Sequence, residues 1–389
     1  MDKETYEEEI LESNYEIAED IEKFDPSDIV VYSRDWTIET IQAQIKGGNI
    51  DLNPKFQRRN AWTDEKRSKL IESIIIGYPV PEIVLAEDPN KKRSFIVIDG
   101  KQRLLTVAGY IDPKTYNYWS RPKLQRLQVR DDLNGLGYSE LHSDPKFSNE
   151  LREFQNSSLR CTVITNFNAN DVLYDIFYRL NSGSVPLSTQ ELRQVLNRGE
   201  FANYLITITN DKQPVHDVLK LTGPDKRLKD IEIILRVLAF RMFASDYSGN
   251  LKKFLDDKMA LITEDWKKYE DVVMGLYKEL NETIEYLAEI MKSHTKVGRK
   301  VTNNEFESRF NRVIFEVQCF FFMQLDRENL KTTETFVEEF KNLCSNDIEF
   351  RASVESSTKN IESYRTRYTK FQDIINKSFD LKEDLNPFK

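Results

Sequence analysis

The stretch "FIVIDGKQRLLTV" (residues 95–107) decides how the N-terminal half of this chain folds. It begins as an apolar strand and ends with the apolar spacing of a helix. Gly100 lies between the two and permits a tight turn. A turn needs the glycine, but it does not need the polar residues beside it, which are Asp99, Lys101, Gln102 and Arg103.

The polar residues fit a phosphate site. A strand that enters a helix through a glycine turn directs the first helical N–H groups, which lack partners within the helix, toward the loop, and the helix dipole favours anions there. Lys101 and Arg103 add positive charge, Gln102 can hold a water or a sugar hydroxyl, and Asp99 can hold Mg²⁺ or accept a proton. The alternative is an ordinary turn in which Asp99 caps the helix and the cations face solvent.

The chain outside this stretch predicts an α+β fold. Strands are expected at 81–87, 94–99 and 159–165, helices at 37–48 and 64–77 with Thr63 as N-cap, and an irregular segment at 111–158. From residue 168 onward the spacing is helical, as in 170–180, 188–197, 231–243 and 310–325. We therefore expect an acidic leader at 1–28, a small mixed-sheet domain at 29–167 and a mostly α-helical domain at 168–389.

Charge and composition narrow the class of protein. Residues 1–28 carry a net charge of −10, whereas the remaining residues of the 389 carry +1 and offer no general attraction to nucleic acid. The leader fits a solvated helix or tail; a nucleic-acid mimic or a partner-binding arm is the functional alternative. The sequence has no apolar run of membrane-spanning length, and its three cysteines are far apart, so we expect a cytoplasmic protein without membrane contact.

Other polar clusters each have two interpretations. The basic stretch "KSHTKVGRK" (292–300) fits a solvated charge cluster or a nucleic-acid contact, and "YRTRYTKF" (364–371) fits an amphipathic helix or a stacking surface for single strands. His142, His216 and His294 stand far apart, without metal-ligand spacing.

The motif "IDGKQRLLTV" resembles the DGQQR signature of the GmrSD-type restriction endonuclease N-terminal family (domain of unknown function 262), a branch of the ParB/sulfiredoxin-like superfamily. Lys101 replaces the first glutamine. Further blocks of the family are similar, in order and spacing, to "LNPKFQRRNAWTDEKRSKLIESIIIGYPVPEIVL" (52–85), "IFYRLNSGSVPLSTQELRQVL" (176–196) and "RLKDIEIILRVLAF" (227–240).

The resemblance implies a ParB/sulfiredoxin-like N-terminal domain that binds and hydrolyses a nucleoside triphosphate with Mg²⁺, in restriction or anti-phage defence. It assigns catalysis to Asp99, Gln102 and Arg103, the metal to Asp99, and nucleotide binding to Arg58, Gly100 and Lys101. Asn181, in the third block, is expected to line the nucleotide cleft. Many relatives carry an HNH-type nuclease domain, which we do not recognise here, so we expect a separate effector protein as partner.

Two other functions remain open. A nucleotide-gated or DNA-sensing interaction protein would bind without turnover, and a stand-alone ParB-like nuclease would cut DNA itself. Release of phosphate from each NTP separates the first from an NTPase. The base of the nucleotide and homo-oligomerisation are also open, because a phosphate loop does not read the base.

Overall fold

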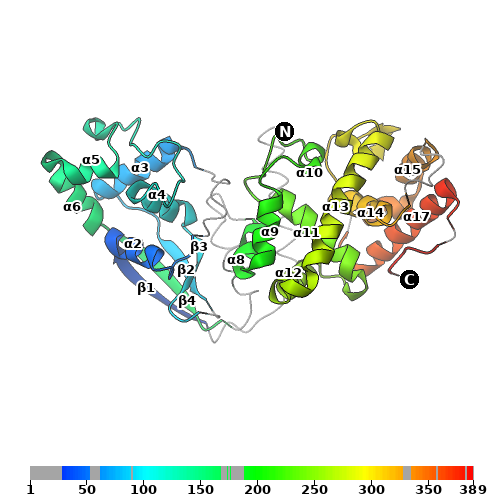
Figure 1. Cartoon of the computed structure of the whole chain (residues 1–389), viewed down its shortest axis with the longest axis horizontal. Helices are drawn as coiled ribbons and strands as arrows, with labels where there is room; N and C mark the ends of the chain where they lie inside the picture. Colours follow the sequence, from blue (N-terminus) through cyan, green and yellow to red (C-terminus); the bar gives the residue numbers. More distant parts are fainter. Residues whose placement is uncertain are drawn as a thin grey trace. The chain divides into compact units, whose positions relative to one another are not determined.

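A computed structural model describes residues 29–52, 62–88, 91–167, 173, 176, 188–326, 334–355, 358–381 and 383–388. These residues fall into two compact units, of which one ends at Leu196 and the other begins at Asn197 (Figure 1). The predicted α+β class is confirmed, because a small mixed sheet lies near the N-terminus and a mostly helical region follows. The acidic leader lies outside the described residues.

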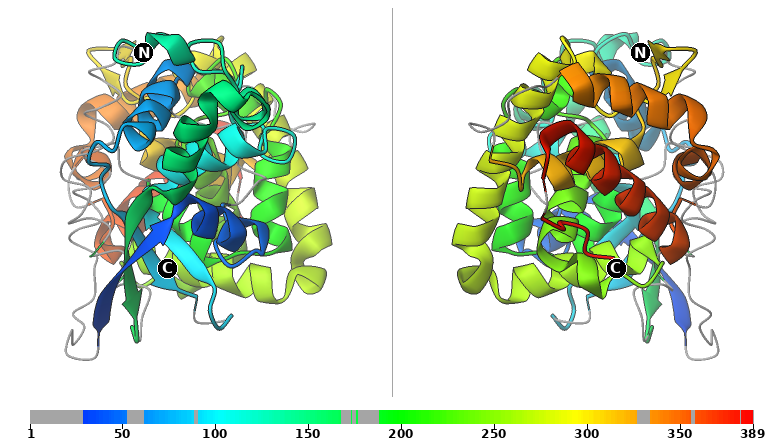
Figure 2. Two further views of the ribbon diagram at one scale, coloured as in Figure 1. Left: turned by 90° about the vertical axis from the view of Figure 1, so that its left-hand side faces the viewer. Right: turned by 90° about the vertical axis from the view of Figure 1, so that its right-hand side faces the viewer.

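The N-terminal unit is built on a four-stranded mixed sheet with the order β1-β4-β2-β3. β1 runs antiparallel to β4, β4 runs parallel to β2, and β2 runs antiparallel to β3. The left view of Figure 2 shows β1 beside β4. The elements are β1 (Val30–Thr37), α2 (Ile38–Lys46), α3 (Asp64–Ile75), β2 (Ile83–Glu87), β3 (Phe95–Asp99), α4 (Lys101–Ile111), α5 (Tyr138–Ser143), α6 (Ser148–Asn156), β4 (Ser158–Thr165) and α8 (Thr189–Leu196).

One face of the sheet packs against helices α2 to α6. Its alternate strand residues, such as Leu85, Val97 and Val163, lie in one buried cluster with Ile71 of α3 and Leu104 of α4. The alternation follows from the two-residue period of a strand, which sends neighbouring side chains to opposite faces. This cluster positions the start of α4 against the end of β3.

The other face packs against α8. Leu192 is fully buried in a second cluster with Val84, Ile96, Ile98 and Ile164. Because α8 covers this face, the compact unit extends to Leu196, later in the chain than the change of pattern near residue 167.

The segment 111–158 is wrongly predicted as irregular throughout. It contains α5 and α6, whose Leu141 and Phe154 are fully buried. Between α4 and α5 the chain is held by α3 in addition to its own backbone hydrogen bonds, such as that from the Leu124 amide to the Leu136 carbonyl. Carboxylate and hydroxyl oxygens of Asp64, Ser68 and Glu72, one turn apart, accept the backbone N–H groups of Ser120, Arg121, Gln125, Val129 and Arg130.

The C-terminal unit is helical apart from one short hairpin. Its elements are α9 (Glu200–Ile208), α10 (Pro214–Val218), α11 (Lys229–Phe243), α12 (Leu251–Glu264), α13 (Trp266–Ile290), β5 (Val301–Thr302), β6 (Glu305–Phe306), α14 (Arg312–Phe322), α15 (Glu334–Asn346), α16 (Ile348–Glu355) and α17 (Ile361–Phe379). The right view of Figure 2 shows α17 crossing one face of this unit. No helix in the described ranges has the length and apolar character needed to cross a membrane.

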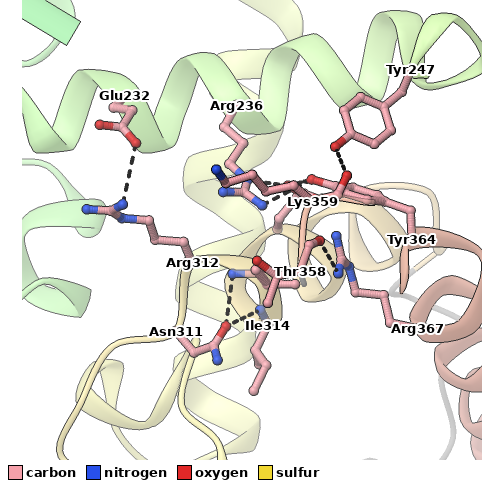
Figure 3. Close-up of polar contacts among 12 residues, drawn as sticks. Glu232, Arg236, Tyr247, Asn311, Arg312, Ile314, Thr358, Lys359, Tyr364 and Arg367 are labelled. Carbon is pink, nitrogen blue, oxygen red and sulfur yellow. Dashed lines mark hydrogen bonds and ion pairs between the residues drawn. The ribbon is translucent and has the colours of Figure 1, made fainter. Parts of the chain in front are cut away.

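A buried polar network holds α11, α14 and α17 together. Glu316 of α14 accepts hydrogen bonds from Arg236 and from the hydroxyls of Tyr364 and Tyr368. Figure 3 shows Arg236 pointing toward Tyr364 and Tyr247 pointing toward the Lys359 carbonyl.

The amphipathic reading of "YRTRYTKF" is therefore confirmed. Tyr364, Arg367, Tyr368 and Phe371 are fully buried and belong to the core of the unit, so these aromatic side chains are not available to stack on nucleic acid bases.

Candidate functional site

The site begins at the junction of β3 and α4. Gly100 has φ +90° and ψ +8°, the left-handed region that side chains other than glycine rarely adopt. A Cβ atom at this position would also lie 2.5 Å from Cδ1 of Ile83 on the neighbouring strand. Conformation and space together require a glycine here, which explains the abrupt turn from strand to helix.

The start of α4 has no side-chain cap. Gly100 is the N-cap, and the Leu104 amide makes a helical bond of 3.0 Å to the Gly100 carbonyl. The amide groups of residues 101–103 precede that bond and therefore point out of the helix end. Lys101 and Gln102 are half-buried at this end.

Arg103 and Asp99 form an ion pair across the turn. Arg103 Nη2 donates to Asp99 Oδ2 over 2.7 Å and to the Glu82 carbonyl over 2.9 Å. The Arg103 side chain is 11% exposed and that of Asp99 is 30% exposed. The alternative interpretation of the turn is therefore wrong for two of its residues, since Asp99 binds Arg103 instead of capping the helix, and Arg103 is not in solvent.

Two buried polar atoms beside this pair have no hydrogen-bond partner among the described residues. They are Oε1 of Gln102 and Nε of Arg103. Buried polar atoms are nearly always paired in folded proteins, so each such atom marks a place with unused hydrogen-bonding capacity. Both lie in the first turn of α4, where a ligand on the helix end would come closest.

The structure adds Glu82 to the residues that the sequence singles out. The carbonyl of Glu82 accepts from Arg103, and its carboxylate accepts from Thr162 of β4 over 2.8 Å. No sequence signal marks Glu82, because it acts through its backbone and through strand pairing. Arg58 and Asn181, which were expected to contact the nucleotide, lie outside the described residues.

The fourth block of the resemblance lies in the C-terminal unit and makes structural contacts. Asp230 is buried against His216, and Glu232 lies 3.8 Å from Arg312 (Figure 3). In the basic stretch 292–300, Arg299 is 1% exposed and donates to the carbonyls of Val218, Val297 and Ser308, so the interpretation as a solvated cluster is wrong for this residue.

Metal and disulfide sites are absent from the described part of the chain. It contains no group of three or more His, Cys, Asp or Glu side chains that could hold a metal ion. Cys161, Cys319 and Cys344 are buried free thiols. Asp99 could therefore bind Mg²⁺ only together with other donors, such as phosphate oxygens and water, which is the common arrangement for this ion.

Fold and site together define a small α+β domain with a strand–glycine–helix turn and an aspartate–arginine pair across that turn. Residues 38–196 match the family model of the GmrSD restriction endonuclease N-terminal domain. The match ends at Leu196, where the N-terminal unit also ends. The match is therefore to the N-terminal domain of a restriction-type family, and no HNH domain is matched.

The other comparisons are negative. Neither the curated proteins nor the solved structures gave a significant match to the chain.

Proposed function

We propose that the N-terminal unit binds a nucleoside triphosphate at the start of α4 and hydrolyses it with Mg²⁺, and that this cycle controls a separate effector protein of a restriction-type system. The observation that carries the proposal is the outward-directed helix end beside Asp99. Gly100 permits the tight turn into the helix, the amides of residues 101–103 face the phosphates, and Lys101 adds charge.

Asp99 has one oxygen to offer to Mg²⁺. Its Oδ2 accepts from Arg103, whereas its Oδ1 accepts no hydrogen bond from a described residue. One carboxylate plus substrate phosphates is a usual ligand set for this ion. When bound, Mg²⁺ would polarise the phosphoryl oxygens, and Gln102 would orient the attacking water.

The experiment compares wild type with Asp99→Asn. Calorimetry measures NTP affinity without metal, and phosphate release measures turnover with Mg²⁺. Asparagine removes the charge that repels the triphosphate, so metal-free affinity should stay equal or rise, while hydrolysis falls at least about tenfold. Asp131→Asn, a change at an exposed aspartate, is the control.

A second function is favoured by one observation. Asp99 is already paired with Arg103, which leaves less of its carboxylate for chemistry. A nucleotide-gated or DNA-sensing protein would bind NTP and release no phosphate. Wild-type turnover at the level of the Asp99→Asn variant supports this second function and excludes catalysis by Asp99.

A further inference from the structure

The Arg103 guanidinium lies beneath the turn and does not extend over it. Nη2 donates to Oδ2 of Asp99, at the end of β3, and to the carbonyl of Glu82, just before β2. One nitrogen therefore ties α4 to both strands of this antiparallel pair, at the end of the pair where Asp99 lies opposite Val84. The side chain is nearly fully buried in this position.

Gly100 closes over the same guanidinium. A Cβ at Gly100 would lie 3.3 Å from both Nε and Nη2 of Arg103, so the guanidinium packs directly against the glycine. To reach a phosphate above the helix end, Arg103 would have to break both hydrogen bonds and leave its buried position. Lys101 is half-buried at the same helix end.

We infer that Arg103 is a positioning residue, which acts on the nucleotide through Asp99 and does not bind the phosphates itself. The inference rests on the proposed function. Arg103 holds Oδ2, so that Oδ1 is left for the metal, and its charge offsets the negative charge of Asp99 beside the triphosphate. The phosphates then rest on the amides of residues 101–103 and on Lys101.

The test is a double-mutant cycle with Asp99→Asn and Arg103→Lys in the full chain. Metal-free NTP affinity is measured by calorimetry, Mn²⁺ affinity of the NTP complex by electron paramagnetic resonance, and hydrolysis by phosphate release. If Arg103 acts through Asp99, Arg103→Lys should change metal-free affinity less than about twofold, whereas Lys101→Ala should lower it by more than about tenfold. Arg103→Lys should weaken Mn²⁺ binding, and the double variant should hydrolyse no more slowly than Asp99→Asn alone.

Other outcomes overturn the inference. Arg103 would be a direct phosphate contact if the double variant hydrolysed NTP more slowly than Asp99→Asn by the full factor lost in Arg103→Lys alone. The same conclusion would follow if the metal-free affinity of Arg103→Lys fell as far as that of Lys101→Ala. If Arg103→Lys does not fold, as seen by circular dichroism, Arg103→Gln replaces it, because an amide can still donate to the Glu82 carbonyl. A wild-type chain that binds no NTP overturns the proposed function and the inference that rests on it. If wild type binds NTP and either of the first two outcomes is found, the inference alone is overturned.

Discussion

Nε2 of His216 lies 2.9 Å from Oδ2 of Asp230, and both side chains are fully buried. The Gln213 amide donates to Nδ1 of the same ring, so in the neutral imidazole Nε2 carries the proton and donates to Asp230. Asp230 also accepts the backbone N–H groups of Asp225 and Ile231. The pair fixes the connection between α10 and α11 and leaves His216 no lone pair for a metal.

Removing the Asp230 carboxylate should destabilise the C-terminal unit. Asp230→Ala leaves several buried donors without an acceptor, and we expect the free energy of unfolding to fall by about 3–5 kcal/mol. Urea unfolding followed by fluorescence measures the change. Asp373→Ala, at an exposed position of α17, should change it by less than about 0.5 kcal/mol. Equal effects of the two variants would contradict a role for the pair.

Lys101 should contribute charge to nucleotide binding. Lys101→Gln places at this position the glutamine of the signature that the motif resembles, and we expect NTP affinity to weaken by roughly 1.5–3 kcal/mol through the loss of a charged contact. The loss should shrink as salt is added, because screening weakens the wild-type contact. Lys114→Gln, an exposed lysine beyond the end of α4, is the matched control. Unchanged affinity in the Lys101 variant would remove Lys101 from the site.

The Glu140 carboxylate should stabilise the N-terminal unit at neutral pH. Its hydrogen bond with Lys123, 2.7 Å long, lowers the pKa of Glu140 from 4.5 to about 2, with help from the Ser139 hydroxyl. A lowered folded-state pKa gives stability that is present above 4.5 and lost as the pH falls toward 2.

Thermal melts at a series of pH values test this dependence. The melting temperature of Glu140→Gln should lie below that of wild type near neutral pH, and the difference should close as the pH falls toward 2. The effect should be small because the pair is largely exposed. Glu153→Gln is the control, and its melting temperature should follow that of wild type across the pH series. A difference in melting temperature between wild type and Glu140→Gln that grows as the pH falls would contradict the prediction.

Helix α8 should be needed for the N-terminal unit to fold. A fragment of residues 29–196 retains Leu192 over the second face of the sheet, whereas a fragment of residues 29–167 exposes Val84, Ile96 and Ile98. We expect the longer fragment to unfold cooperatively and the shorter one to aggregate. In the full chain, Leu192→Ala should cost about 2–5 kcal/mol, and Ile348→Ala, at a position that is 76% exposed, should cost little. A stable shorter fragment would favour the boundary near residue 167.

Local signals in the sequence are sufficient to predict the helices and strands around the site. Thr63 caps α3 by accepting the Lys66 amide, and Gly100 ends β3 where its conformational freedom predicts. These features depend on neighbouring residues, which sequence patterns record.

The rest depends on contacts between distant residues. β1 was not predicted because its residues are mostly exposed and its partner is β4, far along the chain. Burial of Arg103 was missed because it arises from pairing with Asp99 and Glu82 in three dimensions. The extent of the N-terminal unit depends on Leu192, which packs in one cluster with residues of β2, β3 and β4 that lie far from it in the sequence.

The row of acceptors on α3 has a consequence for sequence variation. Asp64, Ser68 and Glu72 accept hydrogen bonds from backbone amides. The side chains of the residues that donate these amides therefore matter little for these hydrogen bonds. Only proline, which has no amide hydrogen, would release the loop. Pro122 lies in the same loop, at a position whose nitrogen takes no part in these hydrogen bonds. The five positions that donate these amides should therefore tolerate a change of side chain but exclude proline; they are Ser120, Arg121, Gln125, Val129 and Arg130.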